Sequence, residues 1–221
     1  GLQRGDFRHQ RVGGGVVLWG FLAWEHRRLD RGHPALLDPA LLSVLRLRSG
    51  LIAFTFQYLL QAGLFFTIPL YLSVALGLSA VATGVRLLPL SVALLVTAVG
   101  VPRFFPRASP RLVVQFGFGG LLVGIVALAA ALDAGAGPEV VTVPLILAGL
   151  GVGALASHLG AVTVSAVPDE RSPEVGGLQN TVTNLGASVG TAVAGAVLIS
   201  ALTTSFFTGI ESNPAVPADV A

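Results

Sequence analysis

Cysteine, methionine and lysine are all absent from this chain of 221 residues. Without cysteine the chain can form neither disulfides nor thiolate metal sites, and it has no cysteine nucleophile. Charged residues make up only 11% of the sequence, whereas an ordinary soluble domain has roughly a quarter. So few charges cannot build a surface that faces water, and a soluble globular fold is therefore excluded.

Long hydrophobic runs dominate the sequence instead. Hydrophobic residues make up 53% of the chain, and its mean hydropathy is +0.82. A helix needs about 20 mostly apolar residues to cross a bilayer core of about 30 Å. Five runs meet or approach this length, and a shorter run at 12–24 fits the end of another span. The sequence therefore predicts an all-α, polytopic transmembrane helix bundle, with spans at about 50–76, 80–101, 112–132, 140–167 and 175–202.

Arginines alternate with these runs. They occur in the connections at 27–48, 103–111 and 171, and they are absent from the intervening connections at 76–83 and 132–139. Short cytoplasmic loops keep arginine and lysine, whereas exported loops lose them. The pI of about 9.9 therefore reflects membrane topology, and we expect no nucleic-acid partner because the arginines form no single patch.

The same alternation predicts the domain organisation and a location in the cytoplasmic membrane. Residues 1–26 would be the flank and end of a preceding span, 27–49 a cytoplasmic loop, 50–202 the five-helix bundle, and 203–221 an extracytoplasmic tail. Arg4, Arg8 and Arg11 break the alternation by preceding the short run on the predicted outer side. Since position 1 is not methionine, we also expect the chain to begin after its native start.

Several span boundaries carry helix-start residues. Ser109-Pro110 and Ser172-Pro173 each offer a serine N-cap followed by proline at the first helical position. Ser79 can cap the second span, and Pro138-Glu139 offers proline with an acidic first turn, which the helix dipole favours. These residues fall where hydropathy already places the ends of the spans.

Two amides and an aromatic ring share one face of the first full span, at Gln57, Gln61 and Phe65. Polar groups in hydrocarbon are costly, so this face is expected to point towards protein or a water-filled path. One interpretation is the wall of a substrate pathway that hydrogen-bonds a ligand. The other is interhelical hydrogen bonding, worth about 0.6 to 2 kcal/mol per bond in membranes. Both interpretations stay open.

Two cationic or titratable side chains lie inside the predicted spans. Arg86 is one turn or so into the second span, where it could line the substrate pathway, bias a proton relay or extend to the outer interface. His158 lies near the middle of the fourth span and is a candidate proton carrier. A neutral histidine bonded to a neighbouring helix is the alternative for His158.

Small residues form stripes at four-residue spacing on the last two spans. This spacing lets helix backbones approach closely, so we assign these residues to helix packing. The stripes are Gly149, Gly153 and Ser157 on the fourth span, and Gly186 and Gly190 on the fifth.

The fifth span also carries Asn180 and Asn184 on one side. An amide left without partners in lipid would cost several kcal/mol, so this face is predicted to point towards a cavity or a packed partner. Asp and Glu, in contrast, are absent from the interior of all five spans. Because proton-coupled transport commonly uses an intramembrane carboxylate, that group is expected elsewhere.

The run from Gly176 to Gly190, GGLQNTVTNLGASVG, resembles a late span of the major facilitator drug:proton antiporters, in the fourteen-span branch of the EmrB and QacA type. Three other stretches are similar to the same branch, in the right order and spacing. They are Phe21–Glu25 followed by His33–Asp38, Thr83–Pro89, and Gly149–Gly153. The resemblance implies that the five spans correspond to the ninth to thirteenth helices and 12–24 to the eighth.

The resemblance further implies that this chain is most of a C-terminal half. The missing N-terminal half would carry the proton-coupling acid and the antiporter motif, and a last span would also be missing. This sequence departs from the family's pattern at two places. The loop at Arg103–Arg107 keeps little of the family's glycine- and basic-rich signature. The late span also has Asn184 where an arginine is common.

We therefore expect a proton-coupled exporter of drugs or other small amphipathic molecules, and not an enzyme. Its partners would be the lipid bilayer, an amphipathic substrate, protons and the missing half, and no metal or cofactor is expected. Gln57, Gln61, Phe65, Asn180 and Asn184 would line the central cavity. The alternatives are an uptake permease of the same fold and a non-transporting membrane assembly subunit.

Overall fold

The computed structural model describes residues 20, 23, 24, 27, 41, 43–131, 137, 139–168 and 171–211. The chain divides into two compact units, Gly1–Leu45 and Arg46–Ala221, and the second contains all of the long helices. Apart from residues 20, 23, 24, 27 and 41, the predicted preceding segment at 1–26 and the predicted loop from 27 to 42 lie outside the described residues.

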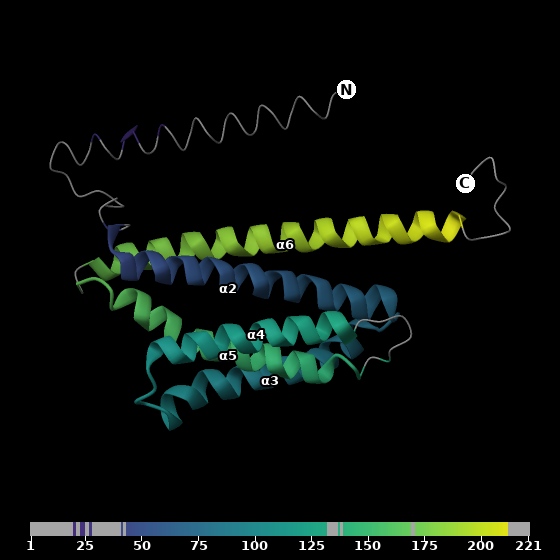
Figure 1. Ribbon diagram of the computed structural model, residues 1–221, viewed down its shortest axis with the longest axis horizontal. Helices are drawn as coiled ribbons and strands as arrows, with labels where there is room; N and C mark the ends of the chain where they lie inside the picture. The colour runs from purple at the N-terminus through teal and green to yellow at the C-terminus, as the bar shows by residue number, and fades with distance from the viewer. Residues whose placement is uncertain are drawn as a thin grey trace. The chain divides into compact units, whose positions relative to one another are not determined.

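All regular structure in the described part of the chain is helical. The elements are α2 (Leu45–Leu70) with a π-helical turn η2 (Tyr71–Ala75), α3 (Ala80–Phe104), α4 (Pro110–Ala131), α5 (Thr142–Val164) and α6 (Ser172–Glu211) (Figure 1). Five of these stretches are long and apolar enough to cross a membrane. The predicted all-α transmembrane bundle is therefore confirmed.

Helix ends differ from the predicted span ends by a few residues in most spans, and by more in α2 and α6. α2 begins at Leu45 rather than Gly50, and α6 continues to Glu211, nine residues into the predicted tail. α5, by contrast, begins only at Thr142, after a turn at Glu139 and Val140. Hydropathy sets how much of a helix lies in lipid, whereas backbone hydrogen bonding can continue a helix beyond its apolar stretch.

Serine caps begin two of the helices, as predicted. The Ser79 Oγ accepts a hydrogen bond from Ala82 N at 3.3 Å, and Ser109 Oγ accepts one from Leu112 N at 3.3 Å. Ser172 differs, since it is itself the first residue of α6 and no cap bond to it is present among the described residues. The connection before Ser79 turns at Gly77, whose φ of 63° is a left-handed conformation that suits glycine.

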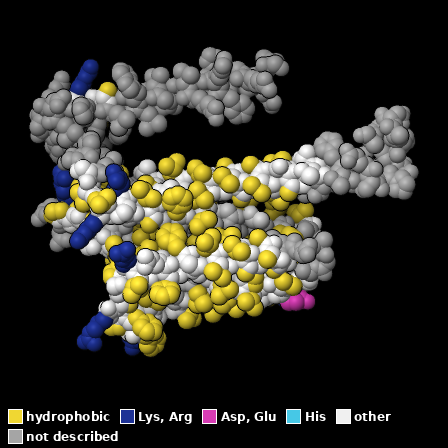
Figure 2. Space-filling view, in the orientation of Figure 1, with side chains coloured by type: hydrophobic (Ala, Val, Ile, Leu, Met, Phe, Trp, Pro, Cys, Tyr) yellow, Lys and Arg dark blue, Asp and Glu magenta, His cyan; other side chains and the backbone are white. Residues whose placement is uncertain are grey.

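Successive helices run in opposite directions, so α2, α4 and α6 share one direction (Figure 1). This brings the connections with Arg103, Arg107 and Arg111 to the same end of the bundle as Arg46 and Arg48. Figure 2 shows arginine side chains gathered at that end of the bundle and an acidic side chain at the other, with apolar surface between. Within the described bundle, we refer to the first as the arginine-bearing end.

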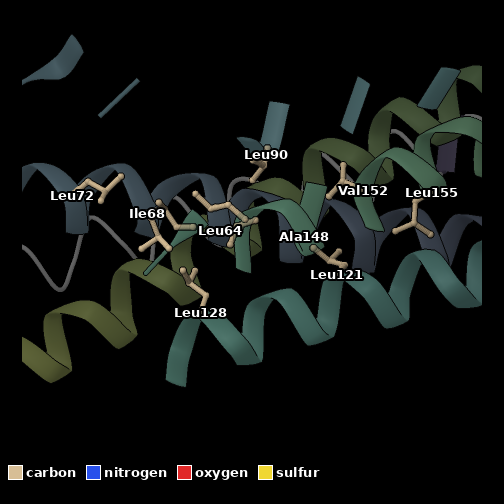
Figure 3. Close-up of a cluster of buried hydrophobic side chains, with 11 residues drawn as sticks. Leu64, Ile68, Leu72, Leu90, Leu121, Leu128, Ala148, Val152 and Leu155 are labelled. Carbon is tan, nitrogen blue, oxygen red and sulfur yellow. The ribbon is translucent and has the colours of Figure 1, made fainter. Parts of the chain in front are cut away.

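Leucine and valine side chains from four helices form the core of the bundle (Figure 3). Leu121 of α4 and Leu145 and Leu155 of α5 are fully buried, and Leu64 and Ile68 of α2 pack into the same cluster. Because α5 contributes along its whole length, it is the central helix of the packing.

Candidate substrate pathway

Gln57 and Gln61 of α2 are buried or half-buried, and the Oε1 atom of each is buried without a hydrogen-bond partner. Gln57 is 3% exposed. It lies seven and eleven residues before Leu64 and Ile68, about two and three helical turns, so it is on the face that joins the core. Both amide oxygens are therefore acceptors with no donor from the described protein.

Phe65 continues this face but is 43% exposed. It lines a pocket of about 530 Å³ between the far end of α2 and the start of α3, at the end opposite the arginines. The pocket is otherwise lined by Phe66, Pro69, Leu70, Ser73, Leu78, Ala80 and Thr83. The structure therefore brings Phe65 together with α3 rather than with α6.

Thr83 in this pocket is a residue that the sequence analysis quoted only within a longer motif. Its side chain is 7% exposed, and its Oγ1 is buried without a hydrogen-bond partner. A threonine hydroxyl in a helix commonly bonds a carbonyl one turn earlier, as Thr97 does to Ala93 O at 2.8 Å. Thr83 lies in the first turn of α3, where its backbone N–H donates to Ser79 O at 2.9 Å while its hydroxyl makes no such bond.

A second missed feature is an aromatic pair on α2. The rings of Phe54 and Tyr58 stack with centroids 6.2 Å apart and an interplanar angle of 15°. They precede Gln61 and Phe65 at spacings that keep all four on one side of the helix. The signal in the sequence was the four-residue spacing of the two aromatic residues.

Asn180 and Asn184 are exposed on α6. The Asn184 Nδ2 donates to Asn180 O at 2.9 Å and to Asn180 Oδ1 at 3.1 Å. Successive helical residues are about 100° apart, so both asparagines lie about 120–160° around the helix from Gly186, which contacts α2. The structure therefore does not bring the asparagines together with Gln57.

His158 of α5 is half-buried and lies six residues before the end of the helix, about 9 Å from it. Its Nδ1 is 2.8 Å from Ser157 Oγ, while that hydroxyl donates to Ala154 O at 2.6 Å. Among the described residues, the imidazole of His158 is thus hydrogen-bonded within its own helix.

Arg86 of α3 pairs with Glu139, which precedes α5, at a distance of 3.8 Å. The side chains are 38% and 71% exposed, so the pair lies at the surface of the end opposite the arginine-bearing one. Glu174, in the first turn of α6, is a further missed residue, since its Oε2 is buried without a hydrogen-bond partner.

The glycine stripes lie at close contacts between helices. A Cβ added at Gly149 or Gly153 would collide with the Leu90 or Leu94 carbonyl oxygen of α3. On α6, a Cβ at Gly186 or Gly190 would collide with the Thr55 or Leu59 carbonyl oxygen of α2. Ser157 continues the α5 stripe and directs its hydroxyl to its own helix.

No group of three His, Asp or Glu side chains that could hold a metal ion occurs among the described residues. The chemistry that these residues offer is hydrogen bonding by amides and hydroxyls beside aromatic and apolar surface. Such a surface is suited to binding and passing a molecule rather than to transforming it.

The sequence model of the Major Facilitator Superfamily matches residues 12–191. The tetracenomycin C resistance and export protein of Streptomyces glaucescens is 36% identical over 157 residues, which cover 68% of this chain and 27% of that protein. The probable actinorhodin transporter of Streptomyces coelicolor is 27% identical over 194 residues, covering 86% of this chain and 34% of that protein. The chain thus spans about a third or less of these curated relatives. No solved structure matches.

Proposed function

This chain belongs to the major facilitator superfamily, and on that premise we propose that it forms most of one half of a proton-coupled exporter of small amphipathic molecules. Family membership makes it a multi-pass membrane transporter rather than an enzyme. The names of its two relatives, one for resistance and export and one for transport, favour export over uptake. We assign it to the cytoplasmic membrane and to the fourteen-span branch.

The observation that carries the proposal is the exposed amide pair on α6. Asn180 and Asn184 lie eight and twelve residues after the first residue of α6, about 12 and 18 Å along the helix. Both positions lie within Ser172–Ala201, the part of α6 that is long and apolar enough to cross a membrane. Although the two amides bond each other, their remaining polar atoms would be costly in lipid. We infer that this face lines the path between two halves of a transporter.

The pocket between α2 and α3 would supply a separate, apolar part of the path. Phe65 and the stacked pair of Phe54 and Tyr58 offer aromatic surface, while Gln61 and Thr83 offer polar atoms that lack partners. Pockets that combine apolar walls with a few placed polar groups suit amphipathic ligands. Movement of one half against the other would then expose the path to each side of the membrane in turn.

Proton coupling would require titratable groups at membrane depth. The spans contain no interior carboxylate, so in this proposal the coupling acid lies in the other half. We assign the relay in the described bundle to His158, whose Nδ1 is in hydrogen-bond contact with Ser157 Oγ. Arg86 is paired with Glu139 at the surface, and we assign it to the outer rim of the path rather than to the relay.

The test is dye export by the natural full-length protein, measured in inverted membrane vesicles energised by a proton gradient. We expect Asn180→Leu with Asn184→Leu to lower the initial rate by about tenfold or more, the equivalent of losing one hydrogen bond of about 1.4 kcal/mol. Gln115→Leu is the matched control, because Gln115 is an exposed amide on α4 away from the proposed path.

Export by the asparagine variant at the wild-type rate would contradict the assignment of the α6 face. A protonophore should abolish transport, and its failure to do so would remove proton coupling from the proposal. Movement of substrate in the opposite direction would identify an uptake permease. A protein that moves no dye or other amphipath would favour the assembly subunit.

A further inference from the structure

We propose that the groove between α3, α4 and α5 at the arginine-bearing end binds an anionic phospholipid of the adjacent leaflet. The groove has a volume of about 580 Å³, within the range of about 300–1,000 Å³ typical of ligand pockets. Its walls include Val101, Phe105, Leu112, Phe116, Leu150 and Ala154. This site is independent of the molecule that the protein transports.

The walls of the groove suit a hydrocarbon chain. Phe105, Leu112 and Phe116 are 64%, 53% and 76% exposed, so the mouth is wide and apolar. The polar side chain on the wall, Thr97, already donates its hydroxyl to Ala93 O at 2.8 Å. A polar solute would therefore find little to bond, whereas an acyl chain would bury apolar surface.

The length of the groove matches one leaflet. Its lining extends from Phe105, in the α3–α4 connection, to Gly120 of α4. Gly120 lies ten residues after Pro110, the first residue of α4, or about 15 Å along the helix. That is half of a hydrocarbon core of about 30 Å. A chain lying in the groove would keep its headgroup at the level of the connection.

The connection supplies cations at that level. Arg107 and Arg111 are next in sequence to the lining residues Ala108 and Leu112, and Arg103 lies in the last turn of α3. All three are exposed, and none has an ion-pair partner among the described residues. Residues 102–111 contain no Asp or Glu. Basic groups between helices on this side attract phosphate headgroups, and guanidinium groups bind phosphate in a bidentate geometry.

A second groove lacks these neighbouring arginines. The groove between α2, α4 and α6 has a volume of about 260 Å³ and is lined by apolar side chains and Thr67, and none of its lining residues is next in sequence to a charged residue. It lacks a group that could select a headgroup. The charge complementarity at the α3–α4–α5 groove is what identifies the occupant as anionic.

The experiment measures lipid binding to the purified full-length protein by native mass spectrometry, with phosphatidylglycerol and phosphatidylcholine of the same chains. We expect Arg107→Gln with Arg111→Gln to weaken phosphatidylglycerol binding by about tenfold and to leave phosphatidylcholine binding unchanged. The control is the double variant Arg46→Gln with Arg48→Gln, which loses the same charge from exposed arginines at the same end. We expect this variant to bind both lipids as the wild type does. Ala108→Trp should fill the groove and abolish binding of both lipids there.

If the two double variants lose phosphatidylglycerol binding equally, the arginines act only through general surface charge, and the proposed site is wrong. Equal affinity of the wild type for the two lipids would overturn the choice of an anionic headgroup. If Ala108→Trp changes the binding of neither lipid, the proposal is wrong, and the groove has another occupant, such as a further segment of the protein.

Discussion

The helices α5 and α6 are both long and apolar enough to cross a membrane, yet they are buried to very different degrees. In the most apolar stretch of each helix, 44% of the residues of α5 and 11% of those of α6 are buried inside the bundle. On α5, glycines face two neighbours, because Gly149 contacts α3 and Gly151 contacts α4. On α6, Gly186 and Gly190 face α2 alone.

This difference distinguishes residues that stabilise the bundle by packing from exposed residues that are available for binding. Small side chains mark the packed faces of both helices. Amide and hydroxyl side chains, at Asn180, Asn184, Ser188 and Thr191, are exposed on the face of α6 that α2 does not cover. In α5, by contrast, Thr163 is fully buried and Ser157 is half-buried.

The largest effect is expected from breaking the packing of α5. Gly149→Val would place a side chain against the Leu90 carbonyl oxygen and the Ala93 side chain. Since α4 packs on another face of α5, the helix cannot shift away, and we expect the free energy of unfolding to fall by about 3 kcal/mol or more. Thermal unfolding in detergent measures this loss. Gly119→Val on α4 is the control, because no atom lies within 4 Å of its added Cβ; equal effects of the two variants would contradict the account of α5.

The same change on α6 should damage function more than stability. Gly190→Val would collide with the Leu59 carbonyl oxygen of α2. Because the opposite face of α6 is exposed, the helix can move outwards, and we expect a loss of only about 1–2 kcal/mol. Vesicle transport should fall by about tenfold, since the displaced helix also moves Asn184. A loss of stability as large as that of Gly149→Val would show that α6 is fixed on both sides.

Much of this contrast could be predicted from the sequence, for definite physical reasons. Hydropathy gave the number of spans, because membrane thickness fixes their length. The caps at Ser79 and Ser109 follow from local hydrogen bonding. The four-residue spacing of Gly149 and Gly153 follows from the helical repeat. Each of these depends only on residues close together in the chain.

Which faces meet could not be predicted, because it depends on packing between distant residues. The sequence analysis grouped Gln57 with Asn184 on one cavity wall, but the structure directs Gln57 into the core and leaves Asn184 exposed. The pocket that joins Phe65 to Thr83 requires the turn at Gly77 to place α3 beside α2. Polarity alone could not tell which amide faces inward.

Gln57 allows this distinction to be sharpened. Its Oε1 is buried and without a partner, so Gln57→Leu removes an unsatisfied polar group and keeps most of the volume. We expect the free energy of unfolding to stay equal or rise by about 1 kcal/mol, with transport reduced if the amide contacts substrate or water in the path. Thermal unfolding and vesicle transport, measured on one preparation, separate the effect on stability from the effect on transport. A loss of more than about 1 kcal/mol would favour interhelical bonding instead.

The smallest effect is expected where α3 and the start of α5 meet at the surface. Arg86 and Glu139 are 3.8 Å apart, and Glu139 is 71% exposed, so water and salt screen their attraction. A double-mutant cycle with Arg86→Gln and Glu139→Gln should give a coupling of about 0.5 kcal/mol or less, which 1 M salt should abolish. A larger coupling that persists in salt would mean that the pair becomes buried in another state of the transporter. Arg86 would then belong to the moving path rather than to its rim, and the outer end would be as functionally distinct as the exposed face of α6.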